Sequence, residues 1–254
     1  MADAILLQLR VRAGRAEARI NDIPVTRVDE EEILNVSVPP QPYLIDGENT
    51  LKLYAAPFDP DRPGAFEARA RIAGFSFGDF ANFDSGETWS DIQWSPEMAG
   101  RPVGQRFAYE TPHRWQWQDA PELTLDDELR GRLDAYVGDL HAAFAQRDAQ
   151  ALVAAREVVF EEGQRAFAPP LIPPSPDEFA QGLAERDEET WRVEPFLPQR
   201  GNYRLVAKRR LVELIGPFGH PLLRQAPAPD VPPDLLMTMP VKVGLVDGEL
   251  KALR

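Results

Sequence analysis

The sequence predicts a mixed fold, in which an N-terminal antiparallel β-sandwich precedes a C-terminal α+β domain with helices packed on a curved antiparallel sheet. Three observations predict it. Runs of alternating apolar and charged residues fill residues 1–118, a helical apolar repeat begins near Thr124, and Asp247-Gly248 separates two strand-like runs near the end. We therefore expect two domains, residues 1–118 and 119–254.

The first domain is predicted from closely spaced strands. Four runs alternate most clearly: residues 5–11, 15–20, 34–38 and 66–72. Turn residues such as Asn21-Asp22 separate them, as is typical of a sandwich. Charged residues at alternate positions predict that one face of each sheet is exposed to water. Phe107 and Tyr109, then Trp115 and Trp117, continue the alternation and predict late strands.

Residues 75–94 combine aromatic and acidic side chains. This composition favours a long loop whose rings are buried in the core or in a domain seam, because aromatic residues are usually buried. The alternative is a platform of rings that stacks on a sugar or a protein partner. Its ligand-binding residues would be Phe80, Phe83, Trp89 and Trp94, together with Trp191 from the second domain.

Helices are predicted from Thr124 onward, where Thr124 and Asp127 match the positions of a capping box. Leu129, Leu133 and Val137 begin an apolar stripe with helical spacing. Asp148 is expected to cap a second helix, with Leu152 and Phe160 among its inward-facing residues. A third, shorter helix is predicted to begin at Ser175 or Asp177.

The remaining residues read as strands. The run 203–215 predicts one strand, with Lys208, Arg209 and Arg210 on a solvated face and Glu213 exposed. Asp247-Gly248 favours a type I′ hairpin, because both central positions of that turn need positive φ. In that register Leu245 lies opposite Leu250 and Val243 opposite Ala252. Lys242 and Gly244 would then lie on the polar face.

Composition excludes several function classes. The net charge of −13 disfavours nucleic acid and anionic membranes as partners. There is no cysteine, and no run approaches the roughly 18 apolar residues of a membrane span. Because no secretory signal pattern occurs at the start, we expect a cytoplasmic protein.

Two stretches resemble known families. The segment Tyr43–Leu51 contains Gly47 and Asn49 in a turn, and it resembles a phrase of galactose-binding and carbohydrate-binding β-sandwich modules. The segment Leu140–Leu152 resembles the link between the first two helices of the NTF2-like (SnoaL-like) superfamily. The second resemblance implies an α+β cone for about the last 130 residues, and dimerisation through its open sheet face. That superfamily includes isomerases, dehydratases and non-catalytic binding domains, so fold alone leaves function open.

Catalytic candidates come only from this second resemblance, which implies a pocket between the first helix and the concave sheet. His141, Tyr136 and Tyr203 are the candidates for a base or a hydroxyl donor. For His141 and Tyr136, a structural role is favoured, because both fit the buried side of the helix. The three histidines lie far apart and form no metal motif, so we expect no metal and no cofactor.

The leading interpretation is therefore a non-catalytic binding or scaffold protein, which binds a small molecule or a protein at the domain seam or in the C-terminal concavity. One alternative is an NTF2-like isomerase or lyase. Another is a carbohydrate-binding sandwich module that uses Trp89 and Trp94.

Overall fold

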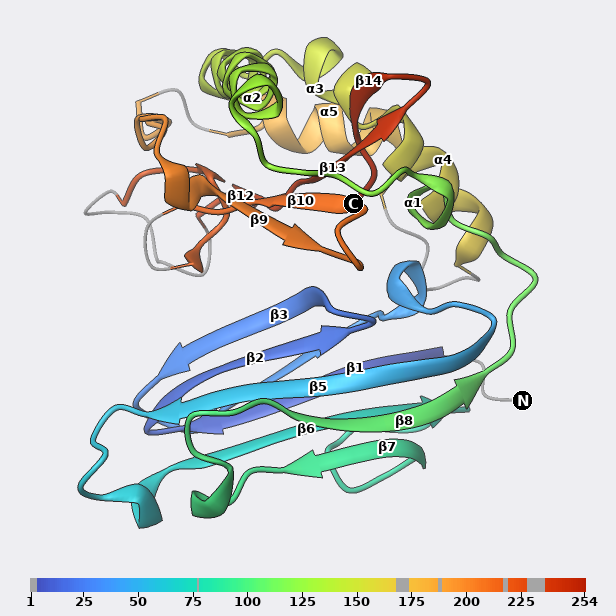
Figure 1. Ribbon diagram of the computed structural model, residues 1–254, viewed down its shortest axis with the longest axis vertical. Coiled ribbons are helices and arrows are strands. Elements are labelled where there is room, and N and C mark those ends of the chain that lie inside the picture. The colour runs from blue at the N-terminus through green and yellow to red at the C-terminus, as the bar shows by residue number, and fades with distance from the viewer. Residues whose placement is uncertain (1–3, 77, 168–173, 187–188, 217–218, 228–235) are drawn as a thin grey trace. The chain divides into compact units, whose positions relative to one another are not determined.

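The computed structural model describes residues 4–76, 78–167, 174–186, 189–216, 219–227 and 236–254 (Figure 1). The chain divides into two compact units. The first comprises Met1–Arg114 with Ala166–Leu171, and the second comprises Trp115–Arg165 with Ile172–Arg254. The fold is mixed α/β with antiparallel sheets, and the described α-helices begin in the second unit.

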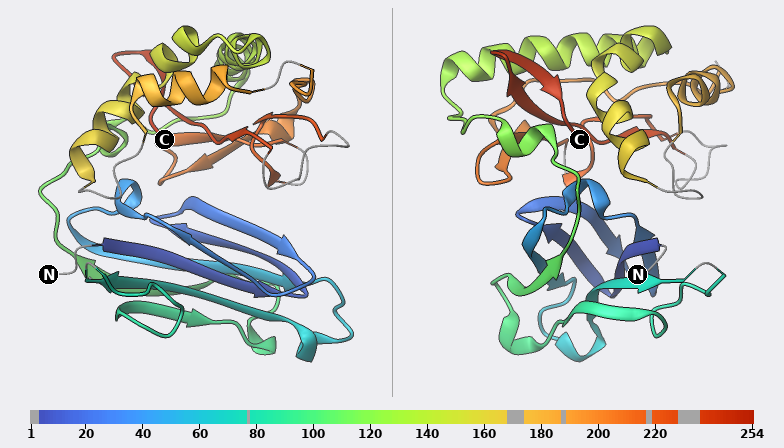
Figure 2. Two further views of the ribbon diagram at one scale, coloured as in Figure 1. Left: turned by 180° about the vertical axis from the view of Figure 1, so that it is seen from behind. Right: turned by 90° about the vertical axis from the view of Figure 1, so that its right-hand side faces the viewer.

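The first unit contains eight described strands and three short 3₁₀ helices. The strands are β1 (Ala4–Arg12), β2 (Gly14–Ile20), β3 (Ile23–Glu30), β4 (Leu34–Val38), β5 (Gly47–Pro57), β6 (Glu67–Phe75), β7 (Glu87–Gln93) and β8 (Val103–Tyr109). The 3₁₀ helices are η1 (Gln41–Tyr43), η2 (Pro63–Ala65) and η3 (Pro96–Met98). The eight strands form two antiparallel sheets, of order β4-β1-β6-β7 and β3-β2-β5-β8. Both sheets appear in the two views of Figure 2.

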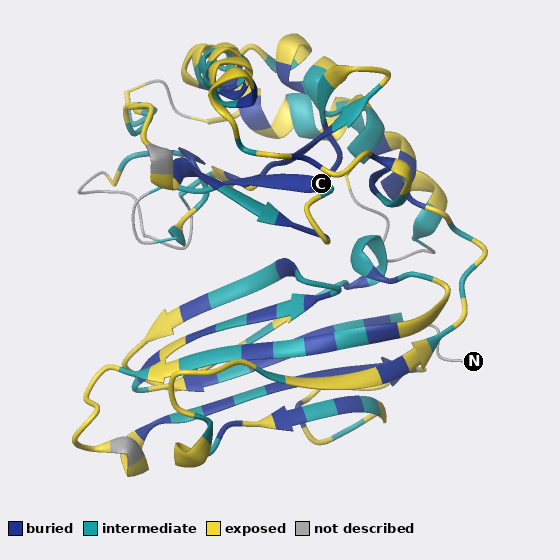
Figure 3. Ribbon diagram, viewed as in Figure 1, coloured by how far each residue is buried: buried dark blue, intermediate teal, exposed yellow. Residues whose placement is uncertain are grey.

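Side chains from both sheets form one hydrophobic core. Leu7 and Leu9 of β1, Ile72 of β6 and Leu51 of β5 are almost completely buried in it. Buried and less buried residues alternate along most of β1 and β5 (Figure 3), whereas residues 70–75 of β6 are all buried. This alternation follows from the two-residue repeat of a strand, which was the basis of the prediction. Residues 87–93, expected to lie in a loop, form β7 because Ile92 joins this core.

Asn49 holds the turn that leads into β5, and its side chain is 0% exposed. Its Oδ1 atom accepts hydrogen bonds from the Ile45 amide (2.8 Å) and the Asn21 side chain (2.7 Å). Its Nδ2 atom donates to the carbonyls of Ile45 (2.8 Å) and Gly47 (3.1 Å). Asparagine side chains in turns commonly bond the neighbouring backbone in this way, so the turn predicted at Gly47 and Asn49 is held by Asn49 itself.

We expect Asn49→Ala to lower the free energy of unfolding by about 2 kcal/mol, because it leaves buried backbone groups without partners. Urea denaturation measures this loss. Asn35→Ala is the matched control, because Asn35 is exposed and its side chain accepts an exposed hydrogen bond from the Arg10 side chain (2.8 Å). Its expected change is within about 0.5 kcal/mol. Equal losses in the two variants would contradict the role of Asn49.

The second unit contains five described α-helices, all of which precede its described strands. The helices are α1 (Gln116–Asp119), α2 (Asp127–Gln146), α3 (Ala149–Ala155), α4 (Glu157–Ala166) and α5 (Pro176–Ala184), with the 3₁₀ helix η4 (Arg200–Asn202). The strands are β9 (Tyr203–Val206), β10 (Leu211–Leu214), β11 (Leu223–Arg224), β12 (Thr238–Met239), β13 (Lys242–Val246) and β14 (Glu249–Ala252). One sheet has the order β14-β13-β10-β9, and β11 pairs with β12.

Helices α2, α3 and α5 cover one side of the four-stranded sheet (Figures 1 and 2). Leu133 and Val137 of α2 pack there with Val212 and Val243 of the sheet, and all four are 0% exposed. The resemblance to the NTF2-like superfamily implied a pocket on this side of the sheet. Aliphatic side chains fill the contact between helix and sheet at these positions.

The helix boundaries agree only partly with the sequence-based prediction. Asp148 caps α3, since its carboxylate accepts a hydrogen bond from the Ala151 amide (3.0 Å). Ser175 caps α5 in a capping box with Glu178. The predicted cap of α2 was wrong, because Asp126, not Thr124, accepts the hydrogen bond from the Leu129 amide.

Two further elements differ from the prediction. The second predicted helix is interrupted at Arg156, so it becomes α3 and α4. Trp115 and Trp117 do not lie in a strand. They flank the start of α1, because the Gln118 side chain accepts a hydrogen bond from the Trp115 amide (2.8 Å) and closes a helical turn.

The final hairpin is confirmed in turn and register. Asp247 and Gly248 both have positive φ, at 52° and 81°. Leu245 pairs with Leu250 and Val243 with Ala252, as predicted. The expected polar face is only partly exposed. Lys242 is 4% exposed and Gly244 is buried, because Leu211 and Leu253 pack against that glycine.

The basic residues 208–210 lie in a turn and not on a strand face. They connect β9 to β10, and Ala207, Lys208 and Arg209 all have left-handed φ, between 53° and 68°. The turn is held by the segment before α2. The Leu123 amide donates to the Arg209 carbonyl (2.8 Å), and the Arg210 side chain donates to the Ala120 carbonyl. Tertiary contacts therefore offset the cost of this backbone conformation.

We expect Lys208→Gly to raise the free energy of unfolding by about 0.5–1 kcal/mol, because glycine adopts left-handed φ without a Cβ clash. Thermal or urea unfolding measures the gain. Lys251→Gly is the control, because Lys251 lies within β14 and its pairing partner is Gly244. There, glycine should lower stability by about the same amount. A loss of stability in Lys208→Gly would show that the turn carries no strain.

Candidate functional site

In the first unit, the loop of residues 78–86 is held by buried side chains of the sheet below it. The loop lies between β6 and β7, on the outer face of their sheet. Arg71 of β6 points to this face, because it alternates with the core residues Ala70 and Ile72. Arg71 is nevertheless only 3% exposed, since the loop covers it. The predicted water-exposed face is therefore wrong at this position.

The Arg71 guanidinium holds the loop through neutral acceptors. It donates to the carbonyls of Phe83 (2.7 Å) and Gly86 (3.1 Å) and to the Thr88 hydroxyl (2.7 Å). Burial lowers the pKa of Arg71, and nearby Asp91 opposes this shift. A buried cation is costly unless its donors are satisfied, so the loop carbonyls stabilise Arg71 as much as Arg71 stabilises the loop.

Gln8 of β1 lies opposite Arg71 in the sheet and makes a second set of contacts with the loop. It is 1% exposed, and its Nε2 atom lies 3.4 Å from the Ala81 carbonyl and 3.3 Å from the Asn82 carbonyl. Arg71 Nη1 lies 3.5 Å from Gln8 Oε1. Gln8 and Arg71 together contact the backbone along most of the second half of the loop.

Phe83 anchors the loop by its side chain. Its ring is 4% exposed and lies under two guanidinium groups, with Arg10 Cζ at 4.5 Å and Arg69 Cζ at 5.2 Å from the ring centroid. Arg69 is itself oriented by two hydrogen bonds to Asp91. Such cation–π contacts add to the stability of a packed ring.

Phe80 lies in the same loop and points away from the protein, with 84% of its surface exposed. Its carbonyl accepts hydrogen bonds from the Asn82 amide (2.8 Å) and the Ser85 hydroxyl (2.6 Å). The loop therefore holds its own backbone in a defined turn around Phe80. An ordered loop thus presents a large apolar side chain to solvent.

The other predicted ligand-binding residues do not join Phe80 in a platform. Trp94 is 9% exposed and packs edge-on against Phe66 in the core, with ring centroids 4.7 Å apart. Trp89 is half-buried against the same core, beside Tyr109. Trp94 thus belongs to the core and Trp89 packs against it, as the composition favoured, whereas Phe83 is buried on the outer face of the sheet. Phe77 lies outside the described residues.

Two of the catalytic candidates are tyrosines associated with α2: Tyr136 lies in the middle of that helix, and Tyr203 of β9 contacts it through Asp134. The Tyr203 hydroxyl donates to the Asp134 carboxylate. Burial, followed by this hydrogen bond, raises the pKa of Tyr203 far above its ordinary value. The Tyr136 hydroxyl is buried near the Ala252 backbone and makes no hydrogen bond of ordinary geometry with the described residues. Both tyrosines therefore stay protonated at neutral pH.

The remaining candidates in the second unit have structural partners. His141 bonds the Glu194 carbonyl through Nε2 (2.7 Å), which is the structural role that the sequence favoured. Trp191 donates to the Ala145 carbonyl (3.2 Å), and its ring packs on Phe144. These contacts give both His141 and Trp191 a structural role.

The expected exposure of Glu213 was wrong. Its side chain is 6% exposed and accepts two hydrogen bonds from Arg204, at 2.9 and 2.6 Å. Arg204 is its cross-strand neighbour on β9. Alternation within β10 did not predict this burial, because Val212, Glu213 and Leu214 are buried in succession.

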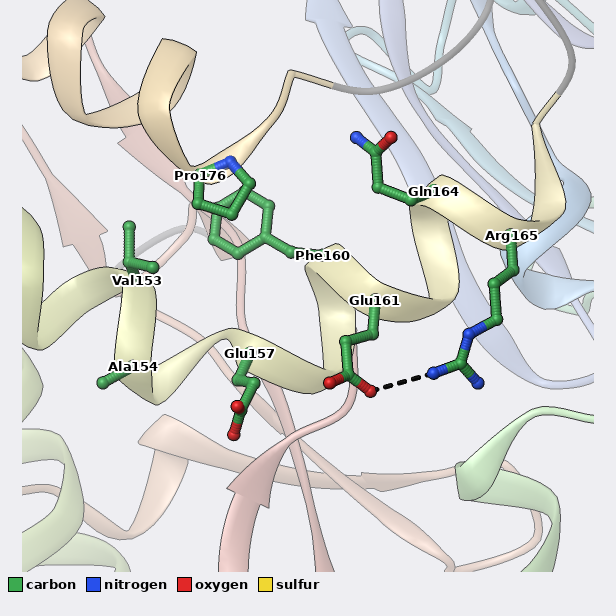
Figure 4. Close-up of a pocket in the computed structure, with 8 residues that line it drawn as sticks. All are labelled: Val153, Ala154, Glu157, Phe160, Glu161, Gln164, Arg165 and Pro176. Carbon is green, nitrogen blue, oxygen red and sulfur yellow. Dashed lines mark hydrogen bonds and ion pairs between the residues drawn. The ribbon is translucent and has the colours of Figure 1, made fainter.

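An open hollow of about 600 Å³ lies along α3 and α4 (Figure 4). Phe160 and Pro176 contribute apolar surface to it, while Glu157, Glu161 and Arg165 follow one another along α4. Glu161 is paired with Arg165 (3.0 Å). The hollow contains none of the residues that the sequence suggested for a site.

Sequence reasoning missed Gln8 and Arg71 as residues that position a candidate site. Their only local signal is a polar residue at alternate positions of a strand, which is also the signal of a solvated face. The signal that could have directed attention to them was the aromatic content of residues 75–94, because a buried ring in a loop needs neighbouring side chains to pack against.

No group of three His, Cys, Asp or Glu side chains that could hold a metal ion occurs in the part of the chain that the structure describes. None of the helices in the described ranges has both the length and the apolar character needed to cross a bilayer. No protein-family model matches the chain, and comparisons with curated proteins and with solved structures find no similar protein.

Proposed function

We propose that the protein is a non-catalytic binding or scaffold protein, and that the 78–86 loop of its first unit is the binding element. The observation that carries this proposal is the 84% exposure of Phe80 on a loop held by two buried side chains. Burying a phenylalanine is worth about 1.5–3 kcal/mol, so an exposed ring forgoes that gain until a partner covers it.

The order of the loop supports the same proposal. A flexible loop loses conformational entropy on binding, whereas a loop already held in one conformation loses little. Aromatic anchors at the centre of a contact commonly supply most of the binding energy. Phe80 has both properties. The aliphatic packing between α2 and the second sheet is a further support for a non-catalytic role.

The test is photo-crosslinking with benzoyl-phenylalanine at position 80 of the full chain, in a lysate of the source cells. We expect one main crosslinked species, which excess wild-type protein removes and excess Phe80→Ala protein does not. Position 58 is the matched control, because Phe58 is 38% exposed and contacts Arg15. The same species at both positions, or no competed species at position 80, would refute the proposal.

A second candidate function is an NTF2-like isomerase or lyase, favoured by the Tyr203–Asp134 pair. In this proposal Asp134 is the base and the Tyr136 hydroxyl is a donor. Turnover of a panel of ketone and hydroxy substrates by wild type, and its loss in Asp134→Asn, would support it. Equal turnover by wild type and Asp134→Asn would dismiss the pair.

The assignments of the two units to known fold families are also proposals. We propose that the first unit is a sandwich of the carbohydrate-binding kind, supported by the Asn49 turn, and that the second is NTF2-like, supported by the α2–Asp148–α3 link. Sugar binding is less well supported, because Phe83 and Trp94 are buried and cannot stack on a ligand. A cytoplasmic location and a homodimer through the second unit remain proposals of the same kind.

A further inference from the structure

The loop that carries Phe80 is acidic, and its neighbouring arginines, Arg10 and Arg69, lie over the Phe83 ring. Asp79, Asp84 and Glu87 are exposed on the same loop or directly after it. The Asp84 carboxylate lies 3.7 Å from Arg69 but keeps 78% of its side chain exposed. Glu87 has no cation partner among the described residues. Phe80 is therefore an exposed apolar residue with exposed carboxylates close to it along the chain, in a protein of net charge −13.

The negative charge of the loop disfavours some classes of partner for Phe80. An exposed aromatic ring can insert into a lipid surface, but cellular membranes are anionic and would repel these carboxylates. Nucleic acid phosphates are repelled for the same reason. Protein interfaces, in contrast, commonly pair an aromatic anchor with an apolar pocket and match charges around it.

We propose that the partner of the 78–86 loop is a protein surface that offers an apolar contact for Phe80 bordered by lysines or arginines, such as a basic amphipathic helix. This inference rests on the proposed function and names the chemistry of the partner. The ring supplies the buried contact, and Asp79, Asp84 and Glu87 select a cationic surface and accelerate encounter at low salt.

The test uses three labelled helical peptides with the same leucine face and with lysine, glutamine or glutamate on the other positions. Fluorescence anisotropy measures their binding to the full chain. We expect the lysine peptide to bind at least ~10-fold more tightly than the glutamine peptide, a difference of about 1.4 kcal/mol. Phe80→Ala should weaken lysine-peptide binding to a similar extent, while Phe58→Ala should not.

Two further variants separate charge from the ring. Asp79→Asn with Asp84→Asn should remove most of the preference for lysine over glutamine, and added salt should do the same for wild type. Equal binding of the lysine peptide to wild type and Phe80→Ala would overturn the inference, because attraction would then be a property of the whole charged surface. Phe80-dependent binding to phosphatidylcholine–phosphatidylglycerol vesicles would also overturn it, in favour of lipid.

Failure of this inference is distinguishable from failure of the proposed function. If crosslinking at position 80 yields a competed protein whose contact surface is neutral or acidic, the binding role stands and the partner chemistry is wrong. If no crosslink is competed and no peptide binding depends on Phe80, both are wrong.

Discussion

Replacing Arg71 by methionine is expected to lower the free energy of unfolding by about 3 kcal/mol and to release the 78–86 loop from the sheet. Methionine fills part of the volume but donates no hydrogen bond. The carbonyls of Phe83 and Gly86 then lose their buried partner. Each such loss costs about 1–3 kcal/mol, and removal of a desolvated charge offsets part of the total.

Two measurements check this result. Urea unfolding gives the loss of stability, and hydrogen exchange gives the opening of the loop, which should rise for the amides of residues 82–88. Arg12→Met is the matched control, because Arg12 is half-exposed and lies 3.7 Å from Glu67 in a surface ion pair. Its effect should stay below about 0.5 kcal/mol.

The outcome for Arg71→Lys distinguishes hydrogen bonding from charge alone. A lysine keeps the charge but its single ammonium cannot replace the planar set of guanidinium donors. We therefore expect Arg71→Lys to resemble Arg71→Met in loop exchange. Retained loop protection in Arg71→Met would show that Phe83 and Gln8 hold the loop without Arg71.

Glu162→Ala is expected to lower the free energy of unfolding by about 3–5 kcal/mol, since it breaks a buried ion pair within the second unit. Glu162 of α4 is 6% exposed, and its carboxylate binds the Arg254 guanidinium and the Gln116 amide. Arg254 is 8% exposed, and its guanidinium stacks over the Trp115 ring at 4.4 Å. Loss of the carboxylate leaves the Arg254 charge buried without this counter-charge.

Glu161→Ala is the neighbouring control. Glu161 pairs with Arg165 at the surface, where an exposed pair contributes little, so the expected change is within about 0.5 kcal/mol. The double variant Glu162→Leu with Arg254→Leu should recover part of the loss, because it removes both charges together. If Glu162→Ala were no more destabilising than Glu161→Ala, the pair would not hold α4 in place.

Both large effects depend on residues that the sequence did not single out, and the reason is distance along the chain. Gln8 and Arg71 are 63 residues apart, and Glu162 and Arg254 are 92 apart. Periodicity reports on neighbours within one turn or one strand. It marks Arg71 as lying on the outer face, but it does not show that a loop covers that face.

What the sequence by itself determined was local. The Asp247-Gly248 turn and its register, the Asn49 turn and the caps at Asp148 and Ser175 follow from backbone preferences and short-range hydrogen bonds. Apart from the contact of Asn49 with Asn21, the interactions that define these features lie within one short segment, so their physical causes are visible in the chain itself.

Only the tertiary structure decided which polar residues are buried and which rings are exposed. Glu213 and Arg71 are covered, Lys208 lies in a left-handed turn, and Phe80 alone among the predicted ligand-binding rings points into solvent. Each outcome depends on which distant segment packs against the residue. A strand or loop pattern is the same whether that segment is present or absent, so the burial of these side chains, and with it the candidate site, follows from packing.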